Sequence, residues 1–406
     1  MPLLYVFFIS FSPPLPRQPE NRTNDTIAAL RLWYNLSEKH YREVRDVNRE
    51  EVFNFSAGPS VLPQSVLERA AAEMLNYKGT GMSVMEMSHR SAPFQEIFDT
   101  AKASLKELLA VPDSHEILLL QGGATLQFAA IPMNLLAGGT ADYAVTGRFS
   151  AKAAAEAKKY GTVRIAYDGA ASGFDRIPKQ DELALSDDAE YFYYCANNTI
   201  YGTEWHYVPE TACPLVCDMS SDILTRRVDF SKYALVYAGA QKNMAPAGLT
   251  VVIVERSLAG HALPYTPEIM DYATMIRTDS MLNTPPCWCI YMLSLVLDWV
   301  RENGGVEAMG ERARERAALL YEVLDESRLF RGRARAEDRS FMNVTFSTGD
   351  PETDARFAAG AAARGFVSVK GHKTAGGMRA SLYNAMPLAG AAKLAEYMRE
   401  FEREHV

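Results

Sequence analysis

The sequence from Ala234 to Val254, ALVYAGAQKNMAPAGLTVVIV, contains the features on which the assignment of the fold depends. Two apolar runs, 234–239 and 249–254, have the length and the β-branched content of buried strands. Between them lies a short loop that carries Gln241 and Lys242. In α/β proteins ligands bind at the carboxyl ends of such strands, so both side chains stand where a binding site is expected.

Apolar runs alternate with helical patterns over most of the chain. Further strand candidates are residues 116–121, 142–146, 190–196 and 214–218. One helical pattern begins at Pro63 and extends to about Tyr77, and another begins at Pro93 and extends to about Leu109. A third lies within 122–136, after the glycines at its start. Strands separated by helices pair in parallel, so we predict an α/β fold with a mostly parallel sheet.

A second region begins near Asn283, and its pattern differs from that of the first. Pro285 and Pro286 begin an apolar helix that extends to about Glu302. After it come a charged helix at 306–326, strand candidates at 341–347, 366–369 and 378–383, and helix candidates at 351–364 and 387–403. We predict a large α/β domain at 47–302 and a smaller carboxy-terminal α+β domain at 303–406.

Residues 1–46 form an amino-terminal extension that we expect to be disordered or absent from the native protein. Residues 1–12 are apolar, but no basic stretch precedes them and no convincing small-residue cleavage site follows, so they match a signal peptide only weakly. We hypothesise that the native chain begins near Val47, because VNREEVFNFSAGPS resembles a natural start. Peptides from residues 1–40, found by mass spectrometry of the protein from its source, would refute this.

Composition excludes several classes of protein. The 406 residues are 48% hydrophobic, 10% aromatic and 23% charged, which is typical of a globular protein. A net charge of -8 would repel a nucleic acid. An odd number of cysteines, five, indicates free thiols and a cytoplasmic protein. The longest apolar run, 287–297, is shorter than the roughly 20 residues of a membrane span.

Lys242 stands at the end of an apolar strand among small residues. Most lysines are solvated surface charges, so one interpretation is that Lys242 has no catalytic role. Partial burial favours the neutral, nucleophilic form of an amine, which makes Lys242 a candidate for a Schiff base. Asp218 ends the apolar run PLVCD in the same way. Its carboxylate could hold a pyridinium nitrogen protonated or could cap the following turn.

Two other groups of residues are candidates for binding anions. The glycines of QGGATLQF precede a helical pattern, whose first N–H groups could bind a phosphate together with the hydroxyl of Thr125. The basic residues of SVMEMSHRSAPF and VKGHKTAGGMRAS come from opposite ends of the chain and are Arg90, His372, Lys373 and Arg379. Taken singly, each of these side chains is typical of a solvated surface residue. Together they could form an anion-binding site in an acidic protein.

Six stretches resemble successive blocks of the phosphoserine aminotransferases, a family of class-V aminotransferases. They are FNFSAGPS, SVMEMSHRS, GGATLQFAA, YAGAQKNMAPAGLTVVIV, NTPPCWCIYML and KGHKTAGGMRASLYNAMPL. They occur in the order of the family and extend from Phe53 to the carboxyl end, which makes the likeness more specific than any single motif. The resemblance implies fold type I of the enzymes that use pyridoxal 5'-phosphate (PLP), and a homodimer.

The resemblance also implies a set of cofactor-binding residues. Lys242 would carry PLP, and Asp218 would pair with its pyridinium nitrogen. Thr199 would lie beside the cofactor ring, and Phe149 would stack on its face. The residues that would bind the cofactor phosphate are Ala124 and Thr125 through their backbone, Gln241, and Asn283 and Thr284 of the other subunit.

For the substrates, the resemblance implies that Arg379 binds the α-carboxylate and that Arg90, His372 and Lys373 meet the remaining anionic groups. The expected reaction is the reversible transamination of 3-phosphohydroxypyruvate with L-glutamate, which gives O-phospho-L-serine and 2-oxoglutarate in L-serine biosynthesis. The amine of Lys242, once displaced by the substrate, would move the proton at the substrate α-carbon, with ping-pong kinetics.

Three features depart from the family pattern. Phe149 stands where many members have tryptophan, which keeps the stacking and loses a ring N–H. The loop GGATLQF lacks an arginine that some members carry. Lys373 stands where arginine is usual after the histidine, so a point charge replaces a bidentate fork and would weaken or retune phosphate recognition.

Other interpretations remain open at this point. A metal site would need Cys195, His206, Cys213 and Cys217, but their spacing matches no common zinc pattern, and we expect structural thiols and no metal. A class-V aminotransferase acting on alanine and glyoxylate would not require the basic cluster. A cysteine desulfurase would need a mobile cysteine, and a non-enzymatic PLP-binding protein could lack the substrate arginines.

Overall fold

The computed structural model describes residues 48–406. The expectations for residues 1–46 and for a start at Val47 lie outside the described residues. Residues Arg49–Glu51 form a short 3-10 helix. Residues Phe53–Val406 form one compact unit, and the account below concerns this unit.

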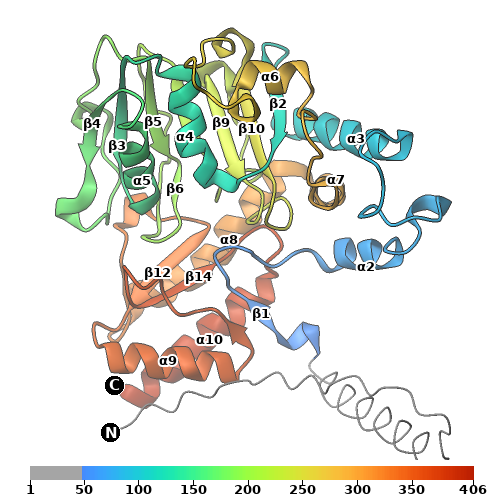
Figure 1. The fold of residues 1–406 in the computed structure, drawn as a ribbon. Helices are drawn as coiled ribbons and strands as arrows, with labels where there is room; N and C mark the ends of the chain where they lie inside the picture. The colour runs from blue at the N-terminus through green and yellow to red at the C-terminus, as the bar shows by residue number, and fades with distance from the viewer. Residues whose placement is uncertain (1–47) are drawn as a thin grey trace, which may run out of the picture. The chain divides into compact units, whose positions relative to one another are not determined.

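A seven-stranded sheet with the order β2-β10-β9-β8-β5-β3-β4 forms the centre of the unit (Figure 1). Its strands are β2 (His115–Leu120), β3 (Thr140–Val145), β4 (Thr162–Asp168), β5 (Tyr191–Cys195), β8 (Leu215–Asp218), β9 (Leu235–Gly239) and β10 (Thr250–Glu255). Pairs β4-β3, β3-β5, β5-β8 and β8-β9 are parallel. The predicted α/β fold with a mostly parallel sheet is confirmed.

Strand β10 is antiparallel to both of its neighbours, β9 and β2, so the expectation of parallel pairing is wrong for this strand. A parallel connection needs a crossover of about a dozen residues or more. Residues 240–249 supply no crossover helix, and the chain returns as a hairpin. Gly248, at φ +126, adopts a backbone conformation in this loop that glycine tolerates best.

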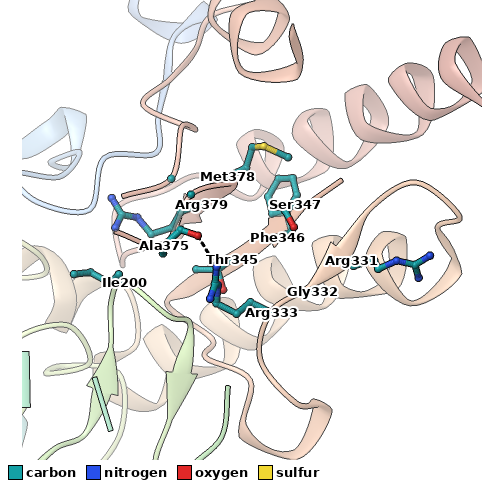
Figure 2. A pocket seen from close by; sticks show the side chains of 12 residues that line it. Ile200, Arg331, Gly332, Arg333, Thr345, Phe346, Ser347, Ala375, Met378 and Arg379 are labelled. Carbon is teal, nitrogen blue, oxygen red and sulfur yellow. Dashed lines mark hydrogen bonds between the residues drawn. The ribbon is translucent and has the colours of Figure 1, made fainter. Parts of the chain in front are cut away.

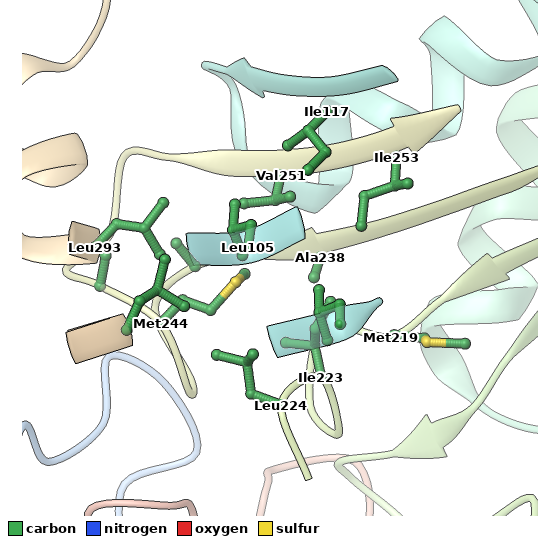
Figure 3. Packing of buried hydrophobic residues seen from close by; sticks show 14 of the residues in the cluster. Leu105, Ile117, Met219, Ile223, Leu224, Ala238, Met244, Val251, Ile253 and Leu293 are labelled. Carbon is green, nitrogen blue, oxygen red and sulfur yellow. The ribbon is translucent and has the colours of Figure 1, made fainter. Parts of the chain in front are cut away.

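Helices cover both faces of the sheet, because alternate strand residues point to opposite sides. One face packs against α3 (Ala92–Leu109) and α7 (Cys287–Glu302). Figure 3 shows Leu105 of α3 and Leu293 of α7 beside Val251 and Ile253 of the sheet. The other face packs against α4 (Gly123–Leu135), α5 (Arg148–Ala157) and α6 (Tyr272–Arg277).

The carboxy-terminal part has its own sheet, β11-β12-β14, and its own hydrophobic cluster. The strands are β11 (Arg331–Gly332), β12 (Asn343–Ser347) and β14 (Met378–Ser381), and the helices are α8 (Gly305–Glu326), α9 (Pro351–Ala363) and α10 (Leu388–His405). Strand β1 (Phe53–Asn54) comes from the beginning of the unit, yet it pairs with β13 (Phe366–Val367). The domain boundary at 302/303 stays a prediction.

The helix expected from Pro63 to about Tyr77 ends earlier. Helix α2 covers Gln64–Ala72, and Tyr77–Gly79 form a separate 3-10 turn. Leu75 between them is 85% exposed, so no packing holds that segment in a helix. The remaining hairpin, β6 (Asn197–Asn198) with β7 (Thr203–Glu204), follows β5 and belongs to the site described next.

Candidate active site

Five predicted cofactor-binding segments follow the carboxyl ends of five parallel strands. The ends of parallel strands meet at one edge of a sheet, so the fold brings these segments together. In the order of the strands β2, β3, β5, β8 and β9, the residues concerned are Thr125, Phe149, Thr199, Asp218 and Lys242.

Lys242 is half-buried and is held from two sides. Its Nζ donates a hydrogen bond of 2.6 Å to Oγ1 of Thr199. The same atom lies 5.8 Å from the centre of the Phe149 ring. Thr199 is buried, and its hydroxyl donates to Oγ of Ser221 at 3.2 Å. The amine therefore has a fixed place beside an aromatic face and does not extend into solvent.

The loop that carries Lys242 packs against the FSAGPS segment at the start of the unit. Ser60 N donates to the carbonyl of Gln241 at 3.0 Å, and the Ser60 hydroxyl donates to the carbonyl of Lys242. Gly58, at φ +128, leaves only enough room for the Gln241 and Lys242 side chains, because a Cβ there would lie 3.3 and 3.4 Å from their Cγ atoms. These contacts join the start of the unit to a loop that lies 182 residues further along the sequence.

Asp218 is the last residue of β8 and is 4% exposed. Its Oδ1 accepts a hydrogen bond of 2.9 Å from Ser220 N, and its Oδ2 accepts one of 3.0 Å from the Tyr237 hydroxyl. Both donors are neutral, and in residues 48–406 no basic side chain forms an ion pair with this carboxylate. A buried carboxylate without a cation is costly, so the site is suited to a cationic ligand.

Helix α4 begins at this edge with Gly122 at φ +89 and Gly123 at φ +67. No side chain caps its first turn, which leaves the N–H groups around Ala124 and Thr125 facing the end of the helix. Gln121 Nε2 donates to the carbonyl of Thr284 at 3.0 Å, so the 283–284 segment adjoins this turn within one chain. A helix end with free N–H groups favours a phosphate.

Arg379 reaches the same region from β14. Its Nη1 lies 3.5 Å from the carbonyl oxygen of Thr199, and its Nε is buried without a partner in the described part of the chain. Burial lowers the pKa of this guanidinium from its ordinary value. Arg379 lines a pocket together with Ile200, Thr345, Arg331 and Arg333.

Figure 2 shows how the arginines of this pocket differ. The side chain of Arg379 extends toward the side where Ile200 lies, whereas Arg331 points the opposite way. Arg333 lies between them and donates to the carbonyl of Ala375 at 2.5 Å. Only Arg379 combines partial burial with a contact to the Thr199 backbone, as a ligand-binding arginine would.

His372 belongs to a group of basic side chains. Burial lowers the pKa of its imidazole below 6.5, and the next largest causes are the charges of Arg148 and Arg379, followed by Lys373 and Lys152. Thr374 N donates to Nδ1 of His372 at 3.2 Å. Since Nδ1 accepts, the neutral ring carries its proton on Nε2, and that N–H can donate to an anion.

Three predicted residues are not joined to the others. Arg90, Asn283 and Lys373 are exposed, and within residues 48–406 no hydrogen bond or ion pair connects their side chains to Lys242, Asp218 or Arg379. Gln241 and Ala124 lie at the sheet edge, but their roles toward a phosphate stay predictions. The structure therefore brings together the proposed cofactor residues of one chain, whereas in residues 48–406 the side chains of Arg90, Asn283 and Lys373 form no hydrogen bond or ion pair with Lys242, Asp218 or Arg379.

Sequence reasoning missed several residues that support this site. Tyr237 and Ser220 bond to Asp218, Ser221 bonds to Thr199, and Arg148 acts on His372. Ser221 stands in the DMSSD stretch next to Asp218, which could have indicated it. Tyr237 is one apolar strand residue among others, so nothing in the sequence separates it from the core.

Other kinds of site find no support among the described residues. All five cysteines are free thiols. In residues 48–406 no three His, Cys, Asp or Glu side chains are arranged to hold a metal ion. The helices described there include none with the length and apolar character needed to cross a membrane.

Comparison with known proteins gives a consistent result. The family model for class-V aminotransferases matches residues 52–394. Phosphoserine aminotransferase of Aromatoleum aromaticum is 51% identical over an alignment of 358 residues, and the match covers 86% of this chain and 98% of that protein. The solved phosphoserine aminotransferase of Bacillus circulans subsp. alkalophilus is 43% identical, with a TM-score of 0.86 over 88% of this chain and 100% of its own.

A third relative is a PLP-bound phosphoserine aminotransferase from Trichomonas vaginalis. It is 39% identical, with a TM-score of 0.83, and the match covers 86% of this chain and 99% of that one.

Proposed function

This chain belongs to the class-V aminotransferase family, and we propose that it catalyses the reversible transamination of 3-phosphohydroxypyruvate with L-glutamate. The products are O-phospho-L-serine and 2-oxoglutarate, and the reaction would serve L-serine biosynthesis. The observation that carries the proposal is one arrangement: Lys242 fixed beside Phe149 and Thr199, with the Arg379 guanidinium 3.5 Å from the Thr199 backbone. It combines a reactive amine with an anion-binding group.

We infer that PLP is the cofactor. The chemistry of the residues fits it, because Asp218 is a buried carboxylate without a cation and suits a pyridinium nitrogen. Phe149 offers an aromatic face to a flat ring, and the uncapped start of α4 at Ala124 and Thr125 offers N–H groups to a phosphate. Gln241 would add a side-chain donor. When bound, PLP supplies an electron sink for a carbanion next to nitrogen.

The chain itself contributes proton transfer and orientation. Nζ of Lys242 would remove the proton from the α-carbon of the amino-acid substrate in one half-reaction and would deliver a proton to the α-carbon of the keto-acid substrate in the other, a role that contributes about 10²–10⁴-fold in rate. Thr199 holds that nitrogen in place through the bond of 2.6 Å. Asp218 stabilises positive charge on the cofactor ring, and Phe149 fixes the ring plane.

Arg379 binds the substrate α-carboxylate in this proposal, because its buried Nε lacks a partner and a carboxylate accepts two N–H bonds from one guanidinium. His372, Lys373 and Arg90 bind the second anionic group, the phosphate of phosphoserine or the side-chain carboxylate of glutamate. Support comes from the free Nε2–H that the Thr374 contact assigns to His372.

We infer a homodimer in which Asn283 and Thr284 reach the cofactor phosphate of the partner. Both residues are exposed in one chain. Sedimentation of the purified protein tests this, since a monomer at assay concentration would contradict it.

We further infer that the enzyme works in the cytoplasm. The support is the five free cysteines, of which Cys195 and Cys217 are buried. Disulfides persist in oxidising compartments, whereas free thiols are usual where glutathione keeps them reduced.

One assay tests the proposed function. The purified protein is supplied with PLP and given phosphoserine with 2-oxoglutarate, beside a parallel reaction with alanine and glyoxylate. We expect turnover with the first pair and a change of the visible absorption band when phosphoserine is added. Turnover with the second pair alone would assign a different substrate class to the same fold.

A further inference from the structure

Asp218 stands at the end of a line of tyrosine hydroxyls. The Tyr237 hydroxyl lies 3.0 Å from Oδ2 of Asp218, and the Tyr193 hydroxyl lies 2.8 Å from that of Tyr237. The three residues are 4%, 0% and 1% exposed, in the order Asp218, Tyr237, Tyr193. Solvent therefore does not reach the line, and these hydroxyls supply contacts that water would otherwise make.

The pairing of the strands explains why these side chains meet. Tyr237 of β9 is the register partner of Asp218 on β8. Tyr193 of β5 is the partner of Val216, two residues before Asp218 on the same strand. Residues paired in register, or two apart on one strand, point to the same face of a sheet. In the central sheet (Figure 1) β8 lies between β5 and β9, so Tyr193 and Tyr237 approach Asp218 from the two neighbouring strands.

The direction of the hydrogen bonds follows from their chemistry. An ionised carboxylate only accepts, so the single proton of the Tyr237 hydroxyl is donated to Asp218. The Tyr237 oxygen can then only accept from Tyr193, which makes Tyr193 the donor of the second bond. Burial is the main cause that raises the pKa of both tyrosines well above 10.0, and the charge of Asp218 is the second. Both groups therefore keep their protons and remain donors.

We propose that Tyr193 and Tyr237 are positioning residues that stabilise Asp218 as a carboxylate and thereby keep the proton on the pyridine nitrogen of the bound cofactor. This inference rests on the proposed function, because it takes PLP as the group that Asp218 meets. A hydrogen bond to the charged form of an acid favours that form. Without the bond from Tyr237, the proton shared between the ring nitrogen and Asp218 moves toward Asp218.

The same sheet supplies a matched control. Tyr143 and Tyr191 form a hydroxyl pair of 2.6 Å, and they are 1% and 0% exposed. The Tyr143 ring stacks on Tyr193 with 4.7 Å between the centroids. In the described residues no hydrogen bond continues from this pair to Asp218. Tyr191→Phe therefore removes a hydrogen bond between two buried tyrosine hydroxyls and leaves in place the hydrogen bonds that link Tyr193 through Tyr237 to Asp218.

The experiment uses the full chain loaded with PLP that carries ¹⁵N in its ring. In Tyr237→Phe we expect the ring-nitrogen NMR resonance to move from the pyridinium position toward that of neutral pyridine. The dissociation constant of PLP should rise about tenfold to a hundredfold, as expected for losing a bond to a charged group. Tyr193→Phe should shift both quantities in the same direction by less, because it acts through Tyr237. Tyr191→Phe should leave both at the wild-type values.

The outcomes separate the two claims. Wild-type protein that takes up no PLP overturns the proposed function and this inference together. Wild-type protein that binds PLP, with a nitrogen resonance unchanged in Tyr237→Phe and Tyr193→Phe, overturns the inference alone. An equal shift in Tyr191→Phe also overturns it, because the effect would then be one of general packing. If Tyr237→Phe does not fold, Tyr193→Phe decides between the same results.

Discussion

The sheet edge around Lys242 and the loop at 370–379 form two sides of one candidate site, and they differ in how complete they are. At the sheet edge Lys242, Thr199 and Asp218 are buried or half-buried and hydrogen-bonded within the chain. In the loop Lys373 is exposed, and the His372 imidazole is hydrogen-bonded to its near neighbour Thr374. We conclude that the chain preorganises its cofactor side, whereas ligands complete the substrate side.

The largest effect is expected from a substitution at the sheet edge, where the cofactor site is preorganised. Lys242→Ala should abolish turnover, because it removes the proposed Schiff-base amine together with an acid–base group that alone contributes about 10²–10⁴-fold in rate. The measurement is the steady-state rate with phosphoserine and 2-oxoglutarate. Dimerisation should be unaffected, which sedimentation checks, and sustained transamination by the variant would refute the role of Lys242.

On the substrate side, Arg379→Ala should weaken binding of the amino-acid substrate by about 1.5–3 kcal/mol, the usual cost of losing a hydrogen bond to a charged group. The change should appear in kcat/KM. Arg331→Ala is the matched control, because Arg331 lines the same pocket but points away from Ile200 (Figure 2). Equal losses in both variants would show that the pocket responds to net charge alone.

A smaller effect tests how firmly the amine is held. Thr199→Val keeps the shape of the side chain but removes the acceptor of the Lys242 bond. We expect kcat/KM to fall by about 0.5–1.5 kcal/mol, typical of one hydrogen bond. Thr203→Val serves as the control, since Thr203 is also buried and its hydroxyl accepts a hydrogen bond of 3.0 Å from Asn198. A kcat/KM in Thr199→Val that equals the control's would remove Thr199 from the site.

The smallest effect concerns the pH dependence of the loop. The pKa of His372 in the free protein lies below 6.5, and a bound anion raises it, so binding takes up a proton. Affinity for phosphoserine should therefore increase as the pH falls through the pKa of the complex, and level off below that of the free protein. His372→Asn should lose this part of the dependence, while the titration of the substrate phosphate persists in both proteins.

The same imidazole provides a sharper readout. Because Arg148 lowers the pKa of His372, Arg148→Ala should raise it, as followed by NMR titration of the ring protons. Lys158→Ala, at the far end of α5, should leave the titration unchanged. An unchanged pKa in Arg148→Ala would mean that the two side chains do not interact.

The sequence predicts the sheet edge around Lys242 better than it predicts the loop at 370–379. Strand ends can be placed from apolar runs, so the meeting of Asp218, Thr199 and Lys242 at one edge follows from their positions after β8, β5 and β9. The direction of β10 is missed because its apolar run resembles a buried parallel strand. The length of the preceding loop, 240–249, contained the information that it forms a hairpin.

Contacts between distant segments could not be predicted from local patterns. Strand β4 lies at the edge of the sheet, and its sequence, TVRIAYD, mixes polar and apolar residues. It therefore contains no apolar run by which a strand could be predicted. The bond from the Ser60 hydroxyl to the carbonyl of Lys242 joins residues 182 apart in sequence. Tyr193 and Tyr237 resemble core residues on their strands, and only the register of the sheet reveals that their hydroxyls meet.

The most direct test of the account is chemical trapping of the lysine. The protein loaded with PLP is reduced with borohydride, digested, and analysed by mass spectrometry. We predict that the cofactor mass is found on the peptide that contains Lys242, and on no other lysine. A label on a different peptide, or a protein that stays colourless after incubation with PLP, would contradict the assignment of this sheet edge as the cofactor site.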